Sequence, residues 1–136
     1  MGGPALIDDT YYPEFDNFYE CEIRYEGHIY KSSEHLFQAF KNTDPNYRKA
    51  IRACLTPFDA WRLGQKCFLR HDWEVAKYGC MFYANHSKFK QNPDLLQKLL
   101  ETTGNVIYHG STPYWNQHNA VILEELRRIL GRVSLS

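Results

Sequence analysis

The sequence predicts a mainly α-helical, compact single domain with a small β-hairpin near its N-terminus. A length of 136 residues allows one hydrophobic core but not two. Two short strand-like segments flank Glu26-Gly27, a sequence typical of a tight hairpin turn. Three helix starts share a cap residue followed by proline, whose missing N–H costs nothing at the first helical position. These starts are Asp44-Pro45, Thr56-Pro57 and Asn92-Pro93.

The N-terminal residues 1–10, with Gly2-Gly3-Pro4 and the acidic pair Asp8-Asp9, are expected to form a flexible leader. The folded domain is expected over residues 11–132, followed by a short tail at residues 133–136. No internal repeat, low-complexity run or linker interrupts it.

Local signals place the other elements in chain order. Ser32 or Ser33 can cap a first helix over residues 33–42, and Asp72 can cap a longer helix near residues 73–90. The remaining expected elements are strands at 20–25 and 28–31, helices near 45–54, 57–66, 93–102 (ending at Gly104) and 120–130 (ending at Gly131), an extended piece at 106–109 and an irregular loop at 112–119.

Charge and composition limit the function classes. The 16 Lys and Arg residues balance the 16 Asp and Glu residues, so nucleic-acid binding would rest on a local basic patch rather than on a long-range field. Aromatic residues make up 15% of the chain, which fits either an aromatic core or stacking surfaces for a base.

The cysteines and the hydropathy pattern predict an intracellular protein. The four cysteines show neither a Cys-x-x-Cys pair nor zinc-ligand spacing, as expected of free thiols in a reducing compartment. Neither a signal sequence nor a run of about 18 apolar residues is visible, so no membrane partner is expected. The expected location is the cytoplasm, with the nucleus as an alternative, and the expected state is a monomer.

The stretch from Ser32 to Asn42 carries the main functional signal. At 3.6 residues per turn, Glu34, Gln38 and Lys41 lie on one line, while apolar side chains occupy most of the remaining surface. So short and apolar a helix is expected to be buried, and buried polar groups need partners or a ligand. The helix is therefore the best candidate for one wall of a pocket.

Lys41 can act as a nucleophile if this helix is buried, because desolvation lowers the pKa of an amine. Glu34, two turns earlier, would then be the natural acid or base. The alternative is a surface lysine whose stem packs against apolar neighbours.

Two further segments admit both a structural and a functional interpretation. Phe15-Asp16-Asn17-Phe18 fits a plain loop anchored by two rings, or a pocket rim in which Asn17 is a donor. Arg70-His71-Asp72-Trp73-Glu74 fits a helix cap with an anchoring tryptophan. It also fits a site that holds a base or sugar against Trp73, with Arg70 near a phosphate.

The common metal and cofactor motifs are missing from the sequence. The six histidines form no His-Glu-x-x-His motif, and no glycine-rich dinucleotide or Walker sequence occurs. A serine nucleophile has no elbow motif either. We therefore expect neither a metal nor a cofactor, and a lone histidine such as His35 is more often structural than a ligand.

Taken together, these motifs resemble the NADAR (YbiA-like) family over about residues 15–130. The resemblance rests on blocks that occur in family order: Phe15-Asp16-Asn17-Phe18, Ser33-Glu34-His35-x-x-Gln38-Ala39-x-Lys41, Leu63-Gly64, Arg70-x-Asp72-Trp73-Glu74-x-x-Lys77-x-x-x-Met81, Lys88-Phe89-x-Gln91 and Leu99-Leu100-x-Thr102. The block around Glu34 and Lys41 is the most specific of them.

The resemblance implies a mostly α-helical fold and an N-glycosidase-type hydrolase. Two substrate classes are associated with the family: N-ribosylated pyrimidine intermediates of riboflavin synthesis, and ADP-ribose attached to guanine bases in nucleic acid. It implies that Lys41 forms a Schiff base with the ribose anomeric carbon and that Glu34 is the essential acid. The ligand-binding residues expected from the motifs are Asn17, Phe18, His35, Gln38, Gly64, Arg70, Trp73, Trp115 and Asn119.

The C-terminal end departs from the family pattern. Tyr108 or His109 stands where the family usually has an acidic residue, and Trp115-Asn116-Gln117-His118-Asn119 lacks the family's glycines. Asn119 or Gln117 takes the place of the family's asparagine. Since glycines allow close backbone approach to a phosphate, this departure bears on substrate choice more than on the core chemistry.

The leading hypothesis is hydrolysis of the bond between ADP-ribose and guanine in a nucleoside or nucleic acid. The alternatives are a glycosidase for small riboflavin-pathway intermediates, a non-catalytic ADP-ribose reader, and a helical protein-interaction domain without a ligand.

Overall fold

The computed structural model describes residues 2–135, with side chains described through Arg132. Within this part of the chain lie six helices, five short strands and one 3₁₀ turn. They are β1 (Ala5–Ile7), β2 (Thr10–Tyr12), η1 (Pro13–Phe15), β3 (Ile23–Tyr25), β4 (His28–Tyr30), α1 (Ser33–Ala39), α2 (Pro45–Ala53), α3 (Pro57–Gln65), α4 (Trp73–Gln91), α5 (Pro93–Glu101), β5 (Val106–Tyr108) and α6 (Pro113–Leu135). The predicted mainly helical domain is confirmed.

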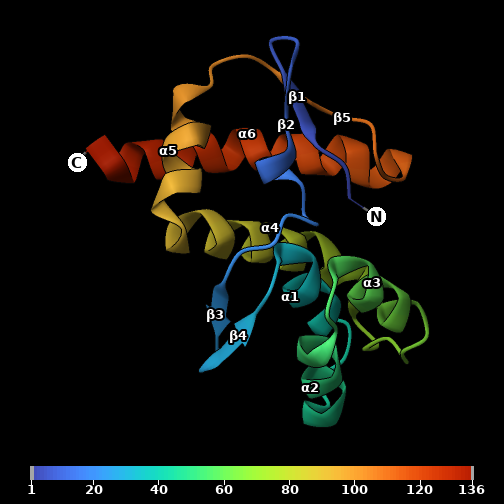
Figure 1. Cartoon of the computed structure of the whole chain (residues 1–136). Coiled ribbons are helices and arrows are strands. Elements are labelled where there is room, and N and C mark those ends of the chain that lie inside the picture. Colours follow the sequence, from blue (N-terminus) through green and yellow to red (C-terminus); the bar gives the residue numbers. More distant parts are fainter. Residues whose placement is uncertain (1, 136) are drawn as a thin grey trace.

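Helix α4 crosses the middle of the molecule and divides it into two layers (Figure 1). On one side it packs against α6, which carries β5 and the strands paired with it. On the other side it packs against α1, which in turn contacts α2 and α3. Apolar side chains from both layers meet on α4 and form one core, with Leu36, Phe89 and Leu126 fully buried.

The predicted hairpin is present. Strands β3 and β4 pair antiparallel, with Ile23 opposite Tyr30 and Tyr25 opposite His28. The two turn residues, Glu26 and Gly27, have φ angles of 51° and 78°. A two-residue turn of this hand needs positive φ at both positions, which explains why glycine follows glutamate here.

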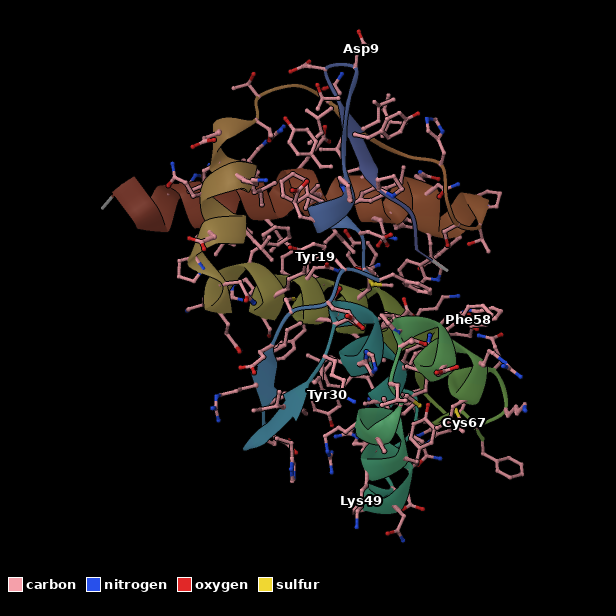
Figure 2. The ribbon with its side chains drawn as sticks, viewed as in Figure 1. Asp9, Tyr19, Tyr30, Lys49, Phe58 and Cys67 are labelled. Atoms are coloured by element: carbon pink, nitrogen blue, oxygen red, sulfur yellow. The ribbon has the colours of Figure 1, made fainter. Side chains whose placement is uncertain are left out.

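The flexible leader predicted over residues 1–10 is wrong for residues 5–10. Strand β1 lies between β2 and β5, and Ala5 and Ile7 are fully buried. Asp8 and Asp9 form its turn into β2, with Asp9 at the tip (Figure 2). Strand β1 forms a short local hairpin with β2, but its pairing with β5, about a hundred positions away, gives no local signal. Met1 lies outside the described residues.

The helix caps followed by proline are borne out at Asp44 and Thr56. Their side chains accept hydrogen bonds from the N–H groups of Asn46 and Asp59, and Ser32 caps α1 in the same way through His35 N–H. Asp72 and Asn92 occupy cap positions without such a bond. The carboxylate of Asp72 pairs instead with Arg70, and the side-chain amide of Asn92 donates to the carbonyls of Glu22 and Lys88.

The irregular loop predicted at 112–119 is wrong, because α6 begins at Pro113. The hydroxyl of Thr112 accepts a hydrogen bond from Trp115 N–H at 3.3 Å, so Thr112-Pro113 is a fourth cap–proline start. The first residues of α6 are mostly polar, so they show no apolar periodicity from which a helix could be predicted. The helix also continues past Gly131 to Leu135, through most of the predicted tail; Ser136 lies outside the described residues.

The predicted stop at Gly104 is also wrong. Helix α5 ends at Glu101, where the N–H of the cap residue Thr102 donates to the carbonyl of Leu99. Across residues 2–135, no helix combines the length and apolar character needed to cross a membrane.

Candidate active site

A cavity of about 560 Å³ opens between α1, α3, the start of α4 and the chain that leads into α6. The fold brings these four segments together because α1 packs on both α3 and α4, while α4 packs on α6. The lining residues are Glu34, Phe37, Gln38, Lys41, Trp61, Gln65, Trp73, Lys77, Met81, Gly110, Ser111, Thr112, Tyr114 and Trp115.

The polar line predicted on α1 forms the floor of this cavity. Glu34 and Gln38 are each 2% exposed and Lys41 is 8% exposed. The opposite side of α1 packs into the core through Leu36. The prediction that this helix is buried, with its polar residues toward a pocket, agrees with the structure.

Burial raises the pKa of Glu34, although a hydrogen bond from Gln38 acts in the opposite direction. The Nε2 of Gln38 donates this bond to Oε2 of Glu34 at 2.5 Å. Gly64 makes the arrangement possible, because a Cβ at this position would lie 1.9 Å from Oε1 of Gln38. The glycine therefore leaves room for the amide that orients the acid.

Burial lowers the pKa of Lys41, and the nearby Glu34 and Cys67 act in the opposite direction. Its Nζ donates to the carbonyl of Gly64 at 3.4 Å. The site thus shifts the pKa of the carboxyl upward and the pKa of the amine downward on the cavity floor. These are the groups needed to protonate a leaving base and to attack a sugar carbon.

Aromatic side chains form the walls. Phe37 lies between Trp73 and Trp115, with its ring centroid 5.3 Å from each of theirs. Tyr114 stands perpendicular to Trp115 at 4.8 Å. Lys77 places Nζ 4.5 Å from the Tyr114 ring and pairs with Glu74 at 2.7 Å. Such walls suit a planar base or sugar, with one cation beside them.

The structure places five of the eleven predicted site residues in the lining of this cavity. Trp73 and Trp115 line it together with the three residues of the polar line. Gly64 contacts Lys41 through its carbonyl and leaves space for Gln38.

Asn17 and Asn119 lie beside the cavity rather than in it. Both line a small adjoining hollow, which also includes Gly110 and Ser111. The side chain of Asn17 accepts from the hydroxyl of Ser33 at 2.9 Å and contacts Sδ of Met81 at 3.4 Å. The buried Oδ1 of Asn119 finds no hydrogen-bond partner among the described residues.

Three predicted ligand-binding residues lie elsewhere. His35 is buried on another side of α1, 2.7 Å from the hydroxyl of Ser32 and 3.0 Å from the carbonyl of Cys54. Phe18 packs against the N-terminal segment near Gly2, and Arg70 lines a different groove. Motif neighbours of His35 and Arg70 line the cavity, but a residue next to them in sequence faces another direction on a helix or turn.

Beyond Gly64 and Trp115, sequence reasoning missed the lining residues of α3 and of the start of α6. Trp61 and Gln65 lie one turn apart on α3, and Tyr114 lies in the predicted loop. A signal did exist for Lys77, because Trp73, Lys77 and Met81 follow one another at intervals of four residues on α4. No group of three or more metal-ligating side chains was found in the described part of the chain.

The helical fold is that of a YbiA-like domain. Residues 7–118 match the NADAR domain, and the chain belongs to the NADAR domain family.

Similar proteins span most of this chain. N-glycosidase YbiA of Escherichia coli is 35% identical over 132 residues, covering 88% of this chain and 82% of that protein. The NMR structure of E. coli YbiA superposes with a TM-score of 0.81 at 32% identity, covering 90% of this chain and 80% of that one. The riboflavin biosynthesis protein VVA0006 of Vibrio vulnificus is 34% identical over 88 residues, which are 63% of this chain but 24% of that protein.

Proposed function

We propose that this protein is an N-glycosidase that cleaves the bond between ADP-ribose and a guanine base through a Schiff base on Lys41. The observation that carries the proposal is the pairing of buried Glu34 with buried Lys41 in one cavity, where burial raises the pKa of the acid and lowers the pKa of the amine. The similarity to proteins named N-glycosidase supports the reaction type.

In the first step, the amine of Lys41 attacks C1′ of the ribose and the bond from C1′ to the base nitrogen breaks. Glu34 gives its proton to the departing base, which leaves neutral. The carboxylate then takes a proton from the newly attached nitrogen and returns it to O4′ as the sugar ring opens. An iminium remains between C1′ and Nζ.

In the second step, water adds to C1′ and the bond from C1′ to Nζ breaks. The sugar leaves as an aldehyde, which can close to its ring form, and Lys41 leaves as an ammonium. Glu34 takes the extra proton, so both groups return to their starting states. One water molecule is consumed in each turnover.

The cavity walls support a substrate with a planar base and phosphates. Trp61, Trp73 and Trp115 offer faces on which a base can stack. Lys77 and the N-terminal turn of α6 at Ser111 and Thr112 would lie near phosphate oxygens, because a helix N-terminus favours anions.

A second candidate is a small ribosylated pyrimidine phosphate from riboflavin synthesis. The similarity to the Vibrio protein and the balanced net charge favour this substrate class. The same two residues would perform the same chemistry, so the candidates differ only in what the outer cavity holds.

Turnover of two substrates would distinguish them: an oligonucleotide with ADP-ribosyl-guanine, and a free ribosylaminopyrimidine phosphate. We expect release of ADP-ribose from the oligonucleotide, and no release by the Lys41→Ala variant. Turnover of the pyrimidine alone would identify the second candidate. Turnover of neither substrate by folded protein would contradict the proposal.

A further inference from the structure

A second hollow of about 360 Å³ lies on the neighbouring face of α4, outside the candidate active site. We call it the α4 groove. Its lining residues are Tyr25, Phe40, Arg48, Arg70, Ala76, Gly79, Cys80 and Tyr83. None of these carries a carboxylate, and two carry a guanidinium.

Gly79 is the unexplained residue of the α4 groove. It lies in the interior of α4, where glycine costs stability relative to alanine. A glycine inside a helix is usually explained by a neighbour that leaves no room for a side chain. A Cβ at position 79 would meet no atom within 4 Å, so packing gives no reason for the glycine. The absence of a side chain keeps the floor of the groove open.

Aromatic rings form one wall of the groove. The rings of Tyr25, Phe40 and Tyr83 contact one another edge to face, with centroids 5.1 to 5.8 Å apart. Tyr83 is 48% exposed, so part of its surface is open to a ligand. A ring wall of this kind favours a planar, aromatic group.

Two guanidiniums complete the groove. Arg48 lies 5.9 Å from the Tyr25 ring centroid, and its Nε–H donates to the carbonyls of Ala39 and Asn42, which fixes its plane. Arg70 is held at 2.6 Å by Asp72. Because Asp72 neutralises Arg70, we expect Arg48 to provide the main attraction for an anion.

The α4 groove and the active-site cavity use adjacent residues of the same elements. On α4, Lys77 and Met81 line the cavity while Ala76 and Cys80 line the groove. The N–H of Arg70 donates to the carbonyl of Lys41 at 2.8 Å, so one backbone contact joins the two hollows.

We propose that the α4 groove binds a nucleotide next to the modified base in a single-stranded nucleic acid, with its base against the rings and its phosphate near Arg48. This inference rests on the proposed function, since it assigns the substrate class to nucleic acid. It also explains why Arg70 lies outside the cavity.

The test measures binding of an unmodified, fluorescein-labelled single-stranded DNA of about ten nucleotides. Gly79→Leu fills the groove, Tyr83→Ser removes a ring, and Gly79→Ala is the matched control that adds one methyl group. We expect Gly79→Leu and Tyr83→Ser to weaken binding by about tenfold, as stacking of one base predicts, and Gly79→Ala to bind like wild type. Melting temperatures show that each variant is folded.

A kinetic comparison separates this inference from the proposed function. Gly79→Leu should raise KM for the modified oligonucleotide while leaving turnover of free ADP-ribosyl-guanosine unchanged. If neither substrate is cleaved, the proposed function fails, but the DNA-binding comparison still tests the groove. DNA binding that is absent in wild type, or unchanged in Gly79→Leu, would overturn the inference.

Discussion

At the scale of single residues, Glu34 and Lys41 are shifted in opposite directions by one cause. Burial disfavours the charged form of each group, so the acid keeps its proton and the amine loses its proton more easily. Burying either group alone would only lower the stability of the folded protein. In the proposed reaction, the same burial favours Glu34 as the proton donor and Lys41 as the nucleophile.

We expect a bell-shaped dependence of kcat on pH. Because the pKa of Glu34 is raised and that of Lys41 lowered, the two limbs should lie closer to neutrality than ordinary glutamate and lysine predict. In the Glu34→Gln variant, no acid remains to lose its proton. The kcat of this variant should be lower than that of wild type, should rise with pH as Lys41 deprotonates, and should then stay constant at higher pH. An alkaline descent that persists in this variant would contradict the role of Glu34.

The Gly64→Ala variant tests the orientation of the acid. The new methyl group would displace the Gln38 amide, since its Cβ would lie 1.9 Å from Oε1, and the bond to Glu34 would be lost. We expect kcat to fall on the order of 10²-fold in a folded protein. Gly64→Ala combined with Gln38→Ala should be no worse than Gln38→Ala alone, whereas additive losses would show a different cause.

At the scale of elements, the starts of helices were the most predictable feature. Ser32, Asp44 and Thr56 act through neighbours two or three positions away, so the sequence window contains the whole cause. Asp72 and Asn92 have the same residue types, but the side chain of Asp72 binds Arg70 and that of Asn92 donates to the carbonyls of Lys88 and Glu22 instead. For Asp72 the competing partner is itself local, whereas for Asn92 it includes the tertiary contact to Glu22.

Helix α4 also buries a lysine that the proposed chemistry does not use. Lys88 is fully buried, and its Nζ donates to the carbonyl of Asp16 at 2.8 Å. This contact holds the loop whose next residue, Asn17, binds the start of α1. Burial lowers the pKa of Lys88 to about 8, while Cys21, Asp16 and Glu14 act in the opposite direction.

We expect the stability of wild type to rise between pH 8 and 10.5 relative to Lys88→Met. In this interval the unfolded lysine binds a proton that the folded one has released, so rising pH favours the folded state. The pKa difference corresponds to roughly 3 kcal/mol. Urea unfolding at several pH values would measure the difference in free energy of unfolding between wild type and Lys88→Met. Both proteins would also carry Cys21→Ala, so that the Cys21 thiol does not contribute to the pH dependence. Parallel stability curves would contradict the prediction.

At the scale of the whole molecule, the N-terminal segment packs against the residues that lead into one wall of the candidate active site. Strand β1 pairs with β5, and Gly3 lies so close to Gly110 that a Cβ on Gly3 would be 2.7 Å from its Cα. Residues 110–115 continue from this contact into α6 and line the cavity. The N-terminal segment predicted to be a leader therefore positions part of the site.

The residues on the floor of the site could be predicted from the sequence, whereas those of the opposite wall could not, because only the floor depends on local contacts. Glu34 and Gln38 lie one turn apart on α1 and Lys41 follows just after the helix ends, so local spacing within eight residues aligns them. The wall formed by Ser111, Thr112 and Tyr114 depends on β1 pairing with β5, a contact between residues about a hundred positions apart. Local patterns contain no information on such a pairing.

The Ile7→Ala variant tests the structural role of β1. Ile7 is buried in the sheet, so its truncation should lower the free energy of unfolding by about 2–4 kcal/mol. Ile107 on the paired strand is 45% exposed and provides the matched control, for which we expect less than about 1 kcal/mol. Equal losses in urea unfolding would show that residues 5–7 are not part of the core.

The central claim is that Lys41 forms a covalent bond with the substrate. Incubation with an oligonucleotide containing ADP-ribosyl-guanine and borohydride, followed by peptide mass spectrometry, tests it most directly. We predict a reduced ADP-ribose adduct on the peptide containing Lys41, in wild type and in Lys77→Ala, which changes another lysine in the same cavity. Release of ADP-ribose with no adduct on Lys41, or full turnover by a folded Lys41→Ala variant, would contradict the account.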